Sequence, residues 1–191
     1  MDTKRIILIG TLVILLAVLT IILFQSGGEK IKPLSSMETL DSKGDTDMPA
    51  ETKQVTLFFI SDKDEFLHKE EREILASSSL VGQIRQTIQE LVKGSQNGYL
   101  APMPPETELR ELYITSDGIL YLDFSRDIKD RHLSGASAEI ETIYSIVNSI
   151  AYNFKSVKKI FFLIEGDEKE TLGGHVDLSR PFLPKYDLIS R

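Results

Sequence analysis

Hydrophobic and polar residues follow distinct periods along the chain, and each period predicts an element. Residues 55–61 (VTLFFIS) are mostly β-branched or aromatic, which predicts a strand that ends at the turn-forming residues 61–64. The next stretch, to about Ala76, shows no clear period and is expected to be irregular or extended. Apolar residues then recur at helical spacing, which predicts a helix of about fourteen residues, capped by Ser78 or Ser79 and closed by Gly94.

The second half of the chain shows a similar alternation of strand and helix signals. After a proline-bearing loop at 102–105, two alternating runs flank Ser116-Asp117-Gly118, and the Asp-Gly pair predicts a tight β-hairpin. A long helix that begins near Ser137 is predicted by one apolar stripe, formed by Ile140, Ile143, Tyr144, Val147, Ile150, Ala151 and Phe154. Residues 157–166 (VKKIFFLIEG) predict a last strand, and a C-terminal extension follows.

This order of elements, strand-helix-strand-strand-helix-strand, predicts an α+β fold. Two helices that each bury one face can cover one side of a mostly antiparallel sheet, giving a two-layer sandwich with ferredoxin-like connectivity. The other side of the sheet also carries apolar residues, so it needs a cover, either from the C-terminal extension or from a second protein. The candidate interface residues are Phe58, Ile60, Tyr121, Phe161 and Leu163.

The N-terminal region has a different composition from the rest. Residues 6–24 are 19 residues without a charge, which as a helix span roughly 28 Å, so residues 1–24 are predicted to be a transmembrane anchor. Lys4 and Arg5 precede the anchor, which predicts a cytoplasmic N-terminus and a single-pass protein of the inner (cytoplasmic) membrane whose C-terminal domain is extracytoplasmic or periplasmic. A cleaved signal peptide is the alternative. Residues 25–54 are polar and predict a flexible linker, which leaves a domain at 55–191.

Charge and composition exclude several functions. The net charge of −7 opposes binding to nucleic acid and to anionic lipid. The chain has no cysteine, which excludes disulfides, thiol chemistry and lipid attachment through that residue. No phosphate-binding glycine motif is present, and no cofactor is expected.

Candidate catalytic and metal-binding groups are sparse. The GxSxG motif of hydrolases is absent, and Ser137 is better explained as the start of a helix. The three histidines are far apart and form no zinc motif, and the acidic residues 61–65 lack the glycine and glutamate of a calcium loop. If the protein were a glycosidase, Glu165 and Asp177 would be the candidate carboxylate pair. The activity of an envelope hydrolase would be expected to depend on Glu165 and His175.

Several motifs follow one another in a recognisable order. They are VTLFFISDKDEFLHKEER, QELVKG, ELYITSDGILYLDFS, GASAEIETIYSIVNSI, VKKIFFLIEG and LGGHVDLSRPF. Together they resemble the sporulation and spore germination domain family, GerMN, over roughly residues 55–182. The resemblance implies a non-enzymatic extracytoplasmic module of membrane-attached envelope proteins, with a fold related to ring-building motifs of secretion systems. It also implies a structural signature formed by Glu165, Gly166, Gly173, Gly174 and His175.

The chain departs from familiar members of that family in two respects. It has no lipid-bearing cysteine, and it carries one domain copy where the germination lipoprotein carries two. The sequence therefore predicts a membrane-anchored domain that binds another envelope protein or its own copies. A ligand-binding module for peptidoglycan or a small envelope molecule, which requires a concave pocket, is one alternative, and an envelope hydrolase is the other.

Overall fold

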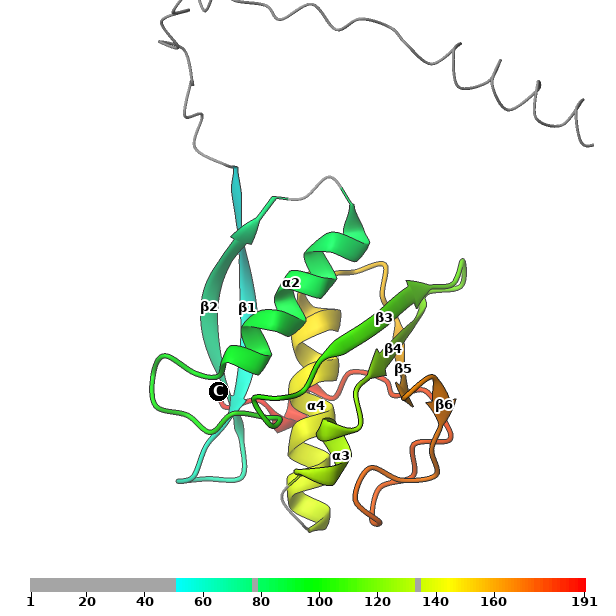
Figure 1. Ribbon diagram of the computed structural model, residues 1–191. Helices are drawn as coiled ribbons and strands as arrows, with labels where there is room; N and C mark the ends of the chain where they lie inside the picture. The colour runs from blue at the N-terminus through cyan, green and yellow to red at the C-terminus, as the bar shows by residue number, and fades with distance from the viewer. Residues whose placement is uncertain (1–50, 77–78, 133–134) are drawn as a thin grey trace, which may run out of the picture. The chain divides into compact units, whose positions relative to one another are not determined.

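The structure, a computed structural model, describes residues 51–76, 79–132 and 135–191 (Figure 1). The predicted anchor at 1–24 and most of the predicted linker lie outside these residues. Within the described ranges, no helix is both long enough and apolar enough to cross a membrane.

The described residues form an α+β domain, as predicted. Its elements are β1 (Thr52–Ile60), β2 (Leu67–Leu75), α2 (Leu80–Lys93), β3 (Leu109–Ile114), β4 (Ile119–Phe124), α3 (Asp127–Asp130), α4 (Ala136–Asn153), β5 (Lys159–Ile164), β6 (Asp167–Glu168) and the 3₁₀ helix η1 (Tyr186–Leu188). The predicted hairpin corresponds to β3 and β4, and the two predicted long helices correspond to α2 and α4. Ser79 caps α2 by accepting a hydrogen bond from the Gly82 N–H at 3.0 Å, as the sequence indicated.

The prediction of a single sheet is wrong. β1 and β2 form a separate two-stranded antiparallel sheet, and the second sheet has the order β3-β4-β5-β6, in which β4 and β5 are parallel. The strand β2 was missed because charged side chains occupy two of its inward positions. Glu70, Arg72 and Ile74 are all buried and alternate with exposed residues, so the two-residue period is present but is not a hydrophobic one.

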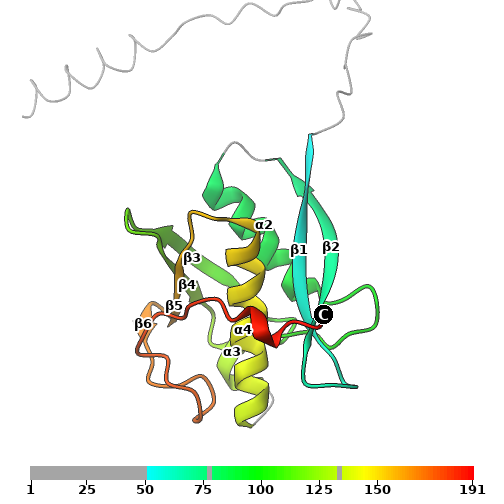
Figure 2. The ribbon, with the colours of Figure 1, turned by 180° about the vertical axis from the view of Figure 1, so that it is seen from behind.

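One hydrophobic core joins both sheets to the helices α2 and α4. Both views of the ribbon show α4 between the β1–β2 pair and the β3–β5 sheet (Figures 1 and 2). Completely buried side chains of two strands and two helices meet in this core, among them Leu57 and Phe59 of β1, Ile88 of α2, Leu122 of β4 and Val147 of α4. The two sheets therefore belong to one cooperative unit.

The edge of β1 that faces away from β2 is closed by polar side chains of α4. The Thr56 N–H donates to Asn153 Oδ1 (2.9 Å), and Asn153 Nδ2 donates back to the Thr56 carbonyl (2.6 Å). The Phe58 N–H donates to Ser149 Oγ (3.0 Å), and the Phe58 carbonyl accepts from the Ser145 hydroxyl. The three helix residues are spaced four apart and so share one helix face. A helix here takes the place of a neighbouring strand.

The C-terminal extension covers part of the outer side of β1. Phe58, Ile60 and Leu67 form a second, smaller buried cluster, against which Leu188 and Ile189 pack. The extension is held by Asn148 of α4, whose side chain accepts from the Lys185 N–H and donates to the Lys185 carbonyl. The Phe182 backbone pairs with Ile160 at the edge of β5. For β1, the outer apolar side chains are therefore covered from within the domain, by the C-terminal extension.

The Ser149→Ala substitution tests the closure of β1 by α4. It removes the acceptor of the buried Phe58 N–H, so we expect the free energy of unfolding to fall by about 1–3 kcal/mol. Ser137→Ala is the matched control, because Ser137 is an exposed serine of the same helix, and it should change stability by less than about 0.5 kcal/mol. Urea denaturation followed by circular dichroism measures both, and equal values for the two variants would contradict the account.

Candidate functional site

A row of aromatic side chains crosses the outer face of the second sheet. Tyr113, Tyr121 and Phe161 are register partners on β3, β4 and β5. The two tyrosine rings stack with centroids 4.5 Å apart, and the Tyr121 and Phe161 centroids are 5.2 Å apart. Tyr113 stands at the β3 edge and is 50% exposed, whereas Phe161 is 7% exposed. The row is thus a series of adjacent aromatic rings whose accessible end is Tyr113.

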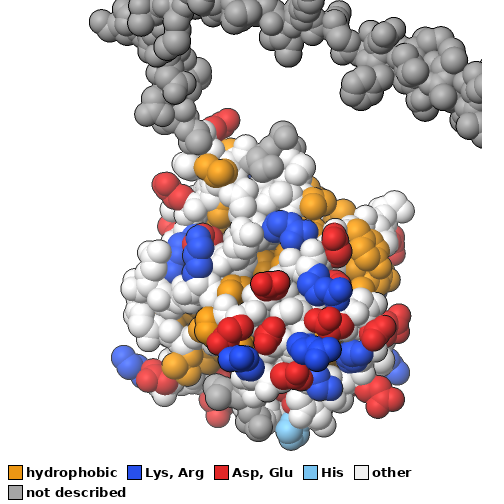
Figure 3. Space-filling model, in the orientation of Figure 1, with side chains coloured by type: hydrophobic (Ala, Val, Ile, Leu, Met, Phe, Trp, Pro, Cys, Tyr) orange, Lys and Arg blue, Asp and Glu red, His pale blue; other side chains and the backbone are white. Residues whose placement is uncertain are grey.

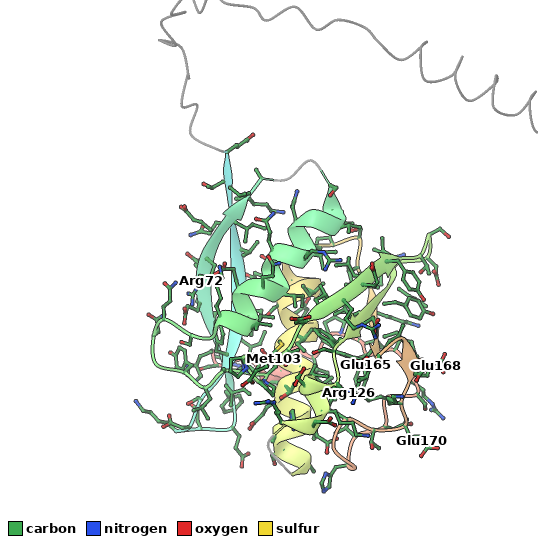
Figure 4. All side chains as sticks on the ribbon, viewed as in Figure 1. Arg72, Met103, Arg126, Glu165, Glu168 and Glu170 are labelled. Carbon is green, nitrogen blue, oxygen red and sulfur yellow. The ribbon has the colours of Figure 1, made fainter. Side chains whose placement is uncertain are left out.

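Charged residues surround this row. Arg110 Nη1 lies 3.5 Å from Asp123 Oδ2 and 3.6 Å from Glu165 Oε2, so one guanidinium joins β3 to β4 and to the β5–β6 turn. Figure 4 shows Arg126 and Glu165 close together, and the Arg126 N–H donates to Glu165 Oε1 (2.9 Å). Figure 3 shows acidic and basic side chains intermingled on the face that carries α2, β3 and α3. That face has no extended patch of a single sign.

Glu165 and Gly166 form the two-residue turn between β5 and β6. Both have positive φ, 58° and 81°, as the tight turn of a hairpin requires. The Gly166 N–H donates to Asp123 Oδ1 (2.8 Å), which fixes this turn to the end of β4. Two motifs of the sequence, LDFS and LIEG, therefore meet because their strands are parallel neighbours.

The loop LGGHV binds a completely buried carboxylate of α4. Glu139, in the first turn of the helix, accepts from the backbone N–H groups of His175 (3.1 Å) and Val176 (3.0 Å) and lies 2.7 Å from His175 Nδ1. A Cβ at Gly173 would lie only 2.9 Å from Glu139 Oε1, so a larger residue here would force the buried carboxylate to move. Gly174 has a φ of 111°, which favours glycine as well. The motif is a cradle for one carboxylate.

The electrostatics of this cradle favour the ionised acid. Burial alone would raise the pKa of Glu139, but the hydrogen bonds from Val176, His175 and Gly173 together hold this pKa below its ordinary value of 4.5. The buried charge is thus stabilised by the loop that it organises.

A second buried charged pair links β2 to the end of α2. The Arg72 guanidinium binds the Glu70 carboxylate and donates to the Gly94 carbonyl at 3.0 Å. Glu70 also accepts from the Ser95 hydroxyl (2.7 Å) and the Gln96 N–H (2.9 Å). Both side chains are more than nine-tenths buried, and Figure 4 shows Arg72 beside β2. The contacts show a structural connection between a strand and a helix terminus.

The groups considered for catalysis do not converge. His68 binds Asp64, His132 binds Thr142, and His175 binds Glu139. In the described parts of the chain, no group of three or more His, Asp and Glu residues could hold a metal ion.

The imagined carboxylate pair of a glycosidase is not supported by the contacts of its members. Asp177 accepts from the Ser179 N–H at 2.8 Å, and its hydrogen bonds with Ser179 are the main cause that lowers its pKa. A general acid requires a raised pKa instead. Glu165 is bound by the Arg126 N–H and faces Arg110, as a turn residue would be.

The candidate interface residues separate into two groups. Phe58 and Ile60, 1% and 8% exposed, are covered from within the domain, so their prediction as a free interface is corrected. Tyr121, Phe161 and Leu163 lie on the outer face of the second sheet. Phe161 is buried there, and Tyr121 and Leu163 are only partly exposed.

The family of the chain follows from a comparison with protein-family models. The family described as Germane, sporulation and spore germination, matches residues 56–170, which is more than half of the chain. The chain belongs to this family. It is not known as a family of enzymes.

Solved structures of other proteins share the fold. The first GerMN domain of the sporulation protein GerM from Bacillus subtilis has 20% identity and a TM-score of 0.54, over 71% of this chain and 99% of that one. The tandem GerMN domains of the same protein have 22% sequence identity and a TM-score of 0.58, over 72% of this chain and 48% of that one. A candidate lipoprotein from Clostridium perfringens has 28% sequence identity and a TM-score of 0.49, over 73% of this chain and 93% of that one. No curated protein matches the chain.

Several important residues of this Germane domain were missed by the sequence analysis. They are Tyr113, Glu139, Ser145, Asn148, Ser149 and Asn153. Three of the α4 residues could have been found from the sequence, because the polar residues at positions 145, 149 and 153 recur every four residues beside the apolar stripe. The sequence signal for Tyr113 is weaker, because it consists only of the position of this tyrosine on the polar side of a hairpin strand.

The Glu139→Gln substitution tests the carboxylate cradle. It removes the charge that the N–H donors of the loop stabilise, so we expect the free energy of unfolding at neutral pH to fall by about 2–3 kcal/mol. Glu170→Gln, at an exposed glutamate, is the control and should have little effect.

The pH dependence of stability provides a second readout of the same variant. The pKa of Glu139 is lowered in the folded state, so its contribution is fully present above about pH 4.5 and is lost as the pH falls through the folded pKa. Below pH 4.5 the wild-type protein should therefore lose stability more steeply than Glu139→Gln. Parallel pH profiles for the two proteins would show that the carboxylate is not stabilised in this way.

Proposed function

We propose that this protein is a non-enzymatic, extracytoplasmic interaction module of the cell envelope, anchored in the membrane by its N-terminal segment. The Germane family membership and the uncharged run at 6–24 support this location. Its role is to bind another envelope protein or a second copy of the same chain.

The observation that carries the proposal is the half-exposed end of the aromatic row, Tyr113. Tyrosine is enriched in protein interfaces, because it offers a large apolar area together with a polar tip. Arg110, Asp123 and Glu165 form a charged rim beside the row, which resembles the polar rim around an apolar interface centre.

The contacts of the other candidate residues favour binding over catalysis. Glu139, Glu165 and His175 each take part in contacts that hold one segment of the domain to another. These contacts explain the signature residues without a reaction. The sheet face, in contrast, has an aromatic edge at Tyr113 that stacks on Tyr121 and still leaves half of its surface exposed.

The alternative of a ligand-binding module has one supporting observation of its own. A pocket lies between the proline loop and the first turns of α4, with Met103 and Pro102 in its wall. It is mainly apolar and has a few polar groups at its walls, as ligand pockets usually do.

A photocrosslinking residue at position 113 tests the proposed surface. The full-length protein, carrying p-benzoylphenylalanine in place of Tyr113, should form a discrete crosslinked product in its native membrane. The control is the same substitution at Leu75, which is 55% exposed and belongs to the other sheet, and it should give no such product. Mass spectrometry of the product distinguishes a second copy from another protein. Equal crosslinking at both positions, or none at either, would count against the outer sheet face as the interface.

A further inference from the structure

A pocket at one end of the domain is built from four segments that are distant in sequence. It has a volume of about 180 Å³ and lies between Ile60 at the end of β1, the loop 100–104, the residues Arg131 and His132 after α3, and the first turns of α4. Its walls are mostly apolar, with Leu100, Pro102 and Met103 among them. This pocket is separate from the aromatic row on the outer sheet face.

The walls of the pocket are held in place before any ligand arrives. The Leu100 N–H donates to the Ile60 carbonyl at 2.8 Å, and the Thr142 hydroxyl donates to the Pro102 carbonyl at 2.6 Å. Since that hydroxyl has only one proton, His132 Nε2, 2.8 Å away, donates to it. Prolines further restrict the loop. A pre-formed pocket of this kind loses little entropy when it is filled.

One charge in this pocket lacks a counter-charge. Arg131 is neutralised by Glu106 (2.9 Å) and Asp127 (3.4 Å). Glu141, by contrast, takes part in no ion pair or hydrogen bond within the described residues. Burial, and secondarily the charge of Glu65, raise the pKa of Glu141. A cation bound beside Glu141 would stabilise its ionised carboxylate and so oppose both effects.

We propose that this pocket binds a lysine side chain of a partner protein. The four methylene groups of lysine suit the apolar walls, and its ammonium group would lie against the Glu141 carboxylate. The apolar rim favours a protein over a free amine: Leu100, which lines the pocket, is 46% exposed, and a partner surface would cover it. The inference shares with the proposed function only the assumption that the domain binds another protein.

The test is a titration of the isotope-labelled full-length chain, in detergent solution, with blocked peptides. The probe is acetyl-Gly-Lys-Gly-amide, and its counterpart carries norleucine, which has a similar chain length and no charge. Amide chemical shifts of Ile60, Met103 and Thr142 report on the pocket, whereas those of Tyr113 and Tyr121 report on the outer sheet face. The lysine peptide should shift the first group only, with a dissociation constant on the order of millimolar.

Two variants separate the roles of charge and shape. Glu141→Gln should weaken binding of the lysine peptide by about fivefold or more, while Glu168→Gln, at an exposed acid outside the pocket, should leave it unchanged. Ala138→Leu, which fills the pocket from α4 with another good helix former, should abolish the shifts.

Three results would overturn the inference. The first is no shift in the pocket residues, and the second is equal affinity for the lysine and norleucine peptides. The third is tighter binding of n-pentylamine than of the lysine peptide, which would indicate a small amine in place of a partner protein. Failure of this titration leaves the crosslinking at position 113 unaffected, so the two proposals can fail separately.

Discussion

The fold depends on hydrogen bonds between the side chains of one helix and the backbone of one strand. β1 pairs with a strand, β2, along one edge, and its other edge has an isolated bridge between Ile60 and Leu100. Without further partners, the rest of that edge would leave buried N–H and carbonyl groups unsatisfied. Ser145, Ser149 and Asn153 of α4 supply those partners to Thr56 and Phe58. Because of this closure, the two-stranded sheet can lie against a helix without a third strand.

The same helix also holds segments that precede and follow it in the chain. Glu139 binds the loop at 173–176, Asn148 binds Lys185 of the extension, and Thr142 binds the proline loop at Pro102. Glu139, Thr142 and Asn148 thus satisfy backbone groups of three different segments, in addition to the β1 groups bound by Ser145, Ser149 and Asn153. This explains how a helix can be buried on nearly all sides while it retains many polar residues. It also explains why the glycine-rich signature is structural in this domain, since its role is to approach a buried carboxylate closely.

The sequence predicted the elements whose signals are local. The Asp117-Gly118 turn, the Ser79 cap and the apolar stripe of α4 depend on neighbouring residues, and all three are present. The arrangement of the sheets was not predictable in this way. The bonds that close β1 join residues 87 to 97 positions apart, and the alternation of β2 is concealed by Glu70 and Arg72.

For the proposed interface, the sequence indicated residues of the outer sheet face but not which residues of that face are accessible. Phe161 and Tyr121 were recognised by their apolar character, yet the accessible residue is Tyr113, because it stands at the edge of the stack. The cover of Phe58 by α4 and the extension likewise depends on tertiary contacts. Periodicity can assign a residue to a face, but only the packing of distant segments decides whether that face remains open.

Native-state hydrogen exchange at Phe58 tests the closure of β1 by α4 most directly. We expect this amide to exchange only with global unfolding, since its N–H is bonded to Ser149 and buried. Glu71 of β2 lies on an exposed strand edge and serves as the internal reference for fast exchange. If the Phe58 amide exchanged as rapidly as that of Glu71, the side chains of α4 would not be closing the edge of β1.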